Sequence, residues 1–128
     1  MTYSTSSEAY EASSRYNKII IDFVKIRNNF TNTAMEKLKR AKQQATEVKS
    51  EFEKSYQSNS QLRNGTVKKL YDLNTSIDSA EKQLQDIISQ INSNIEKCKE
   101  LVAEAAQQFK SLTESEKTWG EKLVDKFL

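Results

Sequence analysis

The residues of this chain that could do chemistry are few and lie far apart. The 128 residues include no histidine, so the commonest general base and the commonest metal ligand are both missing. Cys98 is the single cysteine and falls on an apolar stripe, which is typical of a small core residue. Acidic pairs such as Glu51 and Glu53 are two positions apart and do not share a helix face. We therefore expect no enzyme activity, no metal and no cofactor.

One cluster of basic residues could bind phosphate or an acidic partner. It consists of Lys37, Lys39, Arg40 and Lys42, with Glu36 beside it. The net charge of the chain is only +2, whereas nucleic-acid-binding domains usually carry a large basic excess or a basic stripe. A solvated helix face explains the cluster more simply, so we expect no specific nucleic-acid partner.

The composition indicates long helices. Proline is absent and glycine occurs twice, which leaves few residues suited to tight turns. Hydrophobic residues make up 36% and charged residues 30% of the chain, a balance that suits thin helices with a narrow core. The predicted fold class is all-α.

A first helix is predicted over residues 8–57. Ser7 is its expected N-cap, and the Ser/Thr-rich residues 1–7 are expected to be disordered. Apolar residues then recur three and four positions apart, which is the spacing of one helix face. They are Tyr16, Ile19, Ile20, Phe23, Ile26, Phe30, Ala34, Leu38, Ala41, Ala45, Val48, Phe52 and Tyr56.

A second helix is predicted over residues 66–111, after a turn near 58–65 that contains Asn64 and Gly65. Its apolar residues repeat every seven positions, which is the pattern of a coiled coil. They are Leu70, Ile77, Leu84, Ile91, Cys98, Ala105 and Leu112.

The two stripes match in length and predict an antiparallel helical hairpin over residues 8–112. With the turn centred near residue 62, Ala45 lies opposite Ile77 and Ala41 lies opposite Leu84. Small residues that face large ones allow close helix packing, so both alanines are predicted to be spacers between the helices.

The tail is predicted to form a short third helix over residues 113–128, within the same domain. Thr113 and Glu116 match a capping box, in which each side chain bonds a free backbone N–H of the other. One unbroken second helix is the alternative, because Leu112, Trp119 and Leu123 continue the same stripe.

The apolar stripes are widest at the end of the hairpin away from the turn. Two helices alone cannot bury faces of that width, and large exposed apolar patches mark interaction sites. We predict a contact surface for a protein partner or a second copy there. Its candidate residues are Ile19, Ile20, Val24, Ile95, Val102, Trp119, Leu123 and Phe127.

In outline the predicted hairpin is similar to the WXG family of secreted helical hairpins, which pair with a partner. Those proteins carry Trp-x-Gly in the central turn, where this chain has Leu62-Arg63-Asn64-Gly65, and its only tryptophan, Trp119, precedes Gly120. The resemblance implies a secreted antigen or export-partner role.

The function predicted from the residues is a non-catalytic interaction or scaffold module that forms oligomers or binds a protein. A lipid-surface binder is the alternative, which the narrow apolar face near the turn disfavours. We find no signal peptide and no membrane-spanning segment, which slightly favours the cytoplasm. A secreted chain whose signal has been removed fits the same residues.

Overall fold

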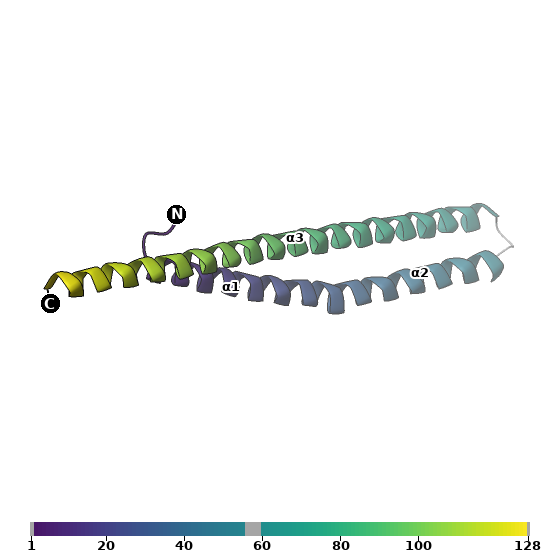
Figure 1. Cartoon of the computed structure of the whole chain (residues 1–128). Helices are drawn as coiled ribbons and strands as arrows, with labels where there is room; N and C mark the ends of the chain where they lie inside the picture. The colour runs from purple at the N-terminus through teal and green to yellow at the C-terminus, as the bar shows by residue number, and fades with distance from the viewer. Residues whose placement is uncertain (1, 56–59, 128) are drawn as a thin grey trace. The chain divides into compact units, whose positions relative to one another are not determined.

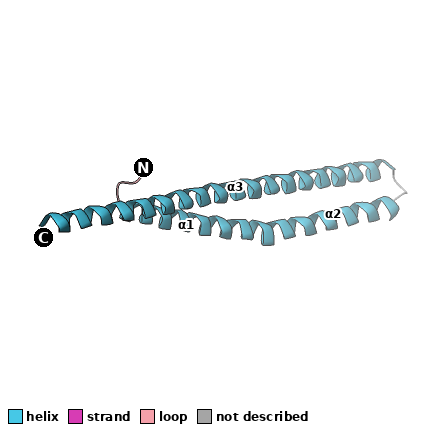
Figure 2. Ribbon diagram, in the orientation of Figure 1, coloured by secondary structure: helices cyan, strands magenta, loops and turns pink. Residues whose placement is uncertain are grey.

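The structure is a computed structural model that describes residues 2–55 and 60–127. The chain forms α1 (Ser6–Asn29), a π-helical turn η1 (Phe30–Ala34), α2 (Met35–Ser55) and α3 (Ser60–Phe127). Figure 2 shows the elements coloured by type, and no strand occurs among the described residues. The predicted all-α helical hairpin is confirmed.

The chain divides into two compact units, each built from two antiparallel helical segments (Figure 1). We call residues 1–25 and 92–128 the terminal unit, and residues 26–91 the central unit. In the terminal unit Ser6 contacts Glu116, and the tilted rings of Tyr10 and Phe109 have their centroids 6.1 Å apart, so the two segments run in opposite directions.

The central unit has the predicted register. Lys42 forms ion pairs with Asp78 and Glu81, and Thr46 bonds Asn74. The Lys42 pairs lie between the predicted pairs Ala41–Leu84 and Ala45–Ile77, and the Thr46–Asn74 pair lies directly beyond Ala45–Ile77. The antiparallel pairing of sequence stripes was therefore predictable to within a helical turn.

The buried core is narrow and made of small and medium side chains. In the terminal unit it comprises Ala9, Ile95, Cys98 and Ala105, and in the central unit Met35, Ala45 and Ile91. Cys98 is a buried free thiol, as its place on the stripe predicts. Alanines in both cores keep the helices close, which thin antiparallel pairs need in order to exclude water.

The predicted start of the first helix is wrong. Thr5, not Ser7, caps α1, because its Oγ1 accepts a hydrogen bond from the backbone N–H of Glu8 (3.2 Å). The Glu8 carboxylate in turn accepts the backbone N–H of Ser4 (3.0 Å). Residues 2–5 are thus tied to the helix rather than disordered. The Thr5-Ser-Ser-Glu8 spacing is a capping-box signal that was legible in the sequence.

A π-turn interrupts the first predicted helix, which the sequence prediction missed. Phe23 and Phe30 are seven residues apart, and Leu38 and Ala45 are seven apart, but eight residues separate Phe30 from Leu38. In η1 the backbone N–H of Met35 bonds the Phe30 carbonyl, five residues back. A π-turn accommodates one extra residue in a helix, so it restores the packing phase after the eight-residue step.

The π-turn also changes which residues of α2 pack. Met35 becomes buried and Lys42 half-buried, whereas Ala41 and Val48, both on the predicted stripe, are exposed. The prediction of two alanine spacers is right for Ala45 and wrong for Ala41.

The predicted turn at Asn64-Gly65 is also wrong, because α3 already begins at Ser60. Gly65 has no positive φ, and a Cβ placed there would meet nothing within 4 Å. A glycine in an exposed helix costs about 1 kcal/mol, which a long helix packed along one face can offset. Residues 58–59 of the predicted turn, and Tyr56 of the predicted stripe, lie outside the described residues.

The predicted break at residues 111–114 is absent, and no separate third helix forms. Thr113 and Thr118 remain in α3 because their hydroxyls donate to the carbonyls of Phe109 (2.7 Å) and Glu114 (3.0 Å). Such back-bonding lets threonine satisfy its polar group inside a helix. The alternative of one unbroken second helix is therefore correct.

Candidate functional site

The start of α1 is fastened to α3 by polar side chains in the terminal unit. The backbone N–H groups of Thr2 and Tyr3 both donate to Oε1 of Gln108 (3.0 and 3.1 Å). Ser6 donates its backbone N–H (3.0 Å) and its hydroxyl (2.6 Å) to the two carboxylate oxygens of Glu116. Glu116, predicted to cap a third helix, thus caps the start of α1 instead.

The pKa values at this junction follow from the same contacts. The hydrogen bond from the Ser6 hydroxyl, and then that from its backbone N–H, hold the pKa of Glu116 below its ordinary value. The hydrogen bond with the Tyr16 hydroxyl (3.4 Å), together with burial, raises the pKa of Tyr3 to about 12. Both shifts move the pKa away from neutral pH, so the Glu116 carboxylate is charged and the Tyr3 hydroxyl is protonated at pH 7.

Replacing Glu116 by glutamine is expected to lower the melting temperature at pH 7 and to have no effect in strong acid. A carboxylate with a lowered folded-state pKa contributes stability above its ordinary pKa and loses it as the pH falls through the folded value. Circular-dichroism melts of Glu116→Gln and the parent at pH 7 and at about pH 2 test this. Glu100→Gln, which changes an exposed glutamate on the same helix, is the control. An equal deficit at both pH values would show that the carboxylate charge plays no part.

The C-terminal part of α3 extends beyond this junction. Because Glu116 lies beside Ser6, the first residue of α1, the following turns of α3 have no α1 residue alongside them. Trp119 is 65% exposed and Val124 is 53% exposed, whereas Leu123 is half-buried. We call the stretch of α3 that carries Trp119, Leu123 and Val124 the terminal apolar surface.

The other predicted contact residues belong to the terminal unit but differ in exposure. Ile95 is only 3% exposed and is core. Ile20, Val24 and Val102 are half-buried, and Ile19 is exposed. The side chain of Phe127 lies outside the described residues. Periodicity therefore selected the correct helix faces but could not separate the buried centre of a face from its exposed margin.

The predicted basic cluster does not form one surface. Lys37 lines one hollow between α2 and α3, whereas Lys39 and Lys42 line another on a different side of the central unit. Lys42 is also engaged, with its Nζ 2.7 Å from Asp78 and 3.6 Å from Glu81. Four neighbouring cations in the sequence thus point around α2, and we find no continuous phosphate-binding patch among them.

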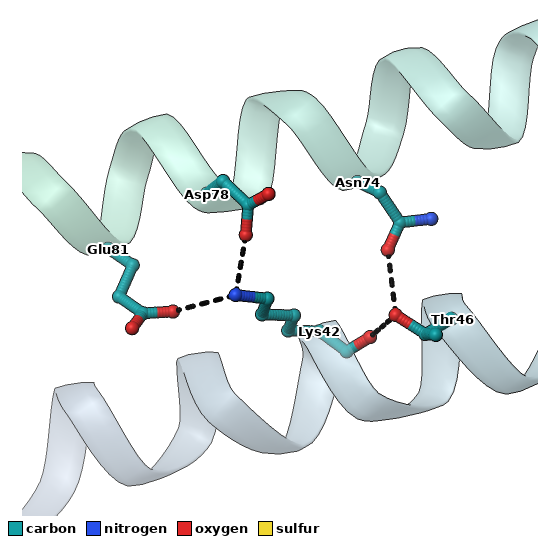
Figure 3. Close-up of polar contacts among 5 residues, drawn as sticks. All are labelled: Lys42, Thr46, Asn74, Asp78 and Glu81. Atoms are coloured by element: carbon teal, nitrogen blue, oxygen red, sulfur yellow. Dashed lines mark hydrogen bonds and ion pairs between the residues drawn. The ribbon is translucent and has the colours of Figure 1, made fainter.

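The polar side of the central unit consists of Lys39, Lys42, Gln43, Thr46, Glu47 and Glu81. Figure 3 shows its contacts: Lys42 reaches across to Asp78 and Glu81, and the Thr46 hydroxyl lies 3.0 Å from Oδ1 of Asn74. The hydrogen bond and charge of Asp78 raise the pKa of Lys42, so this ion pair is lost only as the pH rises above the ordinary lysine range. The Lys42 and Asp78 side chains are partly exposed, so solvent screens their ion pair and its contribution to stability is small.

The opposite side of the central unit is apolar. An open hollow of about 450 Å³ is lined by Ala34, Lys37, Leu38, Ala41, Ala80, Gln83, Leu84 and Ile87. Lys37 is the only charged residue among them. The contrast between the two sides was not predicted, although the seven-residue spacing of Leu73, Ala80 and Ile87 was visible in the sequence.

Other kinds of site leave no trace in the described part of the chain. No group of three or more Cys, Asp or Glu side chains could hold a metal ion there. None of the described helices is long and apolar enough to cross a membrane. A comparison with protein-family models, curated proteins and solved structures finds no match to this chain.

Proposed function

We propose that this chain is a non-catalytic helical interaction module that binds a protein through the terminal apolar surface. The observation that carries the proposal is the 65% exposure of Trp119 on a stretch of α3 that has no α1 residue beside it. An exposed tryptophan on a rigid helix is a common anchor of protein interfaces, because it buries much area at a small entropy cost.

A second copy of the chain is the partner that the charges around this surface favour. Glu121, Lys122, Asp125 and Lys126 alternate in sign along the end of α3. Because both signs of charge occur within two turns, a second copy can align antiparallel without a net like-charge repulsion. Two-fold symmetric contacts of this kind use the same patch twice, which is the commonest arrangement in oligomers.

Trp119 is the only tryptophan and so reports on its own surface. We expect its emission to resemble that of free tryptophan in dilute solution and to shift to shorter wavelength as the chain concentration rises. The mass from light scattering should double over the same range. Trp119→Ala should keep the mass monomeric while leaving the melting temperature of dilute protein unchanged.

Tyr71→Ala removes an exposed aromatic from the central unit and is the matched control for the mass measurement. A mass that stays monomeric at high concentration, with constant emission, would contradict self-association through this surface. A blue shift that needs added anionic lipid vesicles would instead indicate a lipid-surface binder.

A further inference from the structure

A second row of apolar residues runs along the central unit, outside the core. It contains Ala34 at the end of η1, Ala41 and Val48 on α2, and Leu73, Ala80 and Ile87 on α3. Residues seven apart lie on the same helix face, so each set forms a line parallel to its helix axis. Val48, Leu73 and Ile87 are all exposed. We call these six residues the apolar seam.

The seam is a groove because its middle is made of small residues. Ala41 and Ala80 line the hollow of about 450 Å³, together with the larger Leu38, Leu84 and Ile87. Alanines on both helices leave room for a large side chain from a third helix, as a knob fits a hole in a coiled coil.

The shape and length of the seam indicate a helix as its occupant. One row extends from residue 34 at the end of η1 to residue 48 on α2, which is about 21 Å at ~1.5 Å per residue. A helix with apolar residues at the same seven-residue period matches both rows along this length, whereas an extended strand has a repeat of two. Helices dock into apolar grooves in this way in many complexes.

The charge at the groove indicates which sign of charge should flank the apolar row of that helix. Lys37 is the one charged residue that lines the hollow, and it makes no ion pair within the described part of the chain. Gln83 borders the groove on α3 and is neutral. Like charges at a helix interface oppose binding, so acidic flanks suit this groove and basic flanks do not.

We propose that the apolar seam binds an amphipathic α-helix of another protein that carries large apolar side chains at seven-residue spacing and acidic residues beside them. This site is separate from the terminal apolar surface. If no helical peptide binds the seam, the proposed role of Trp119 is unaffected. If the chain does not self-associate through Trp119, the proposal for the seam is unaffected.

The probe is a pair of stapled helical peptides of about three heptads, with leucine in the apolar row and either glutamate or lysine at every flanking position. Each peptide repels its own copies, so it presents a single helix. Titration against the full chain, followed by anisotropy of a dye on the peptide, should show tighter binding of the glutamate peptide by about tenfold or more.

Three variants of the full chain make the test specific. Ala80→Leu fills the hollow and should weaken binding by about tenfold or more, with a melting temperature equal to or above that of the parent. Lys37→Glu should reverse the ranking of the two peptides. Lys39→Glu makes the same charge change on the opposite side of α2 and should leave the ranking as it is.

The proposal is overturned if neither peptide binds, or if Ala80→Leu binds the glutamate peptide as well as the parent does. Equal effects of Lys37→Glu and Lys39→Glu would overturn it as well, because they indicate a general charge effect. A chain that dimerises and becomes monomeric on Ala80→Leu would show that a second copy occupies the seam instead.

Discussion

Ile95→Ala is expected to lower the free energy of unfolding by about 2–5 kcal/mol, the range for removing a large aliphatic side chain from a core. Ile95 is 3% exposed, and no larger-than-alanine side chain among the described residues is more buried. The terminal unit contains only two helical segments, so few side chains can move to fill the space left by the substitution. Urea unfolding followed by circular dichroism measures the effect.

Leu101→Ala is the control for Ile95→Ala. It lies on the same helix in the same unit, but Leu101 is 38% exposed and its loss should cost under about 1 kcal/mol. If the two substitutions shift the urea midpoint equally, Ile95 is not core and the packing of the terminal unit differs from that described here.

Ala45→Phe is expected to destabilise the chain by about 1–3 kcal/mol, because overpacking forces a buried interface apart. Ala45 is 8% exposed and lies between α2 and α3. Ala41→Phe, four residues earlier, places the same ring over the hollow beside Ala80 and should leave stability unchanged or raise it. The pair of urea midpoints tests which alanine faces the core, and a larger loss at Ala41 would contradict the assigned helix phase.

Ala45 is buried and Ala41 is exposed, although the sequence predicted both to be spacers between the helices. Steps of three and four between apolar residues specify a helix and a face, and two matched faces specify an antiparallel hairpin. They do not specify the phase of a face beyond an irregular turn. The π-turn at Phe30–Ala34 rotates α2 relative to the regular pattern, which moves Ala41 to the margin and brings Met35 into the core.

The errors at the helix ends have another cause. Intrinsic propensity marked Asn64-Gly65 as a turn and Thr113 as a helix start, but both lie inside α3. Propensities are worth at most about 1 kcal/mol per residue, and packing of one long face can override them. The capping signal at Thr5–Glu8 was readable, whereas the use of Glu116 by Ser6 depends on contacts between distant residues.

The candidate site was predictable only in part. The exposed Trp119 follows from a stripe that continues past the start of its partner helix. The apolar seam escaped notice because its alanines count as spacers in a two-helix pattern and reveal a groove only when the other helix is in place. The dispersal of the basic cluster around α2 could be read from its spacing, since Lys37 and Lys39 are two positions apart.

The π-turn has a consequence at the level of the gene. A single codon makes the difference between seven and eight residues from Phe30 to Leu38. Without that codon the spacing would be seven residues, and an ordinary α-helical turn would keep the phase of the preceding heptads. With it, the extra residue is accommodated by the π-turn. A chain that lacks that codon is therefore expected to form an ordinary α-helical turn in place of the π-turn.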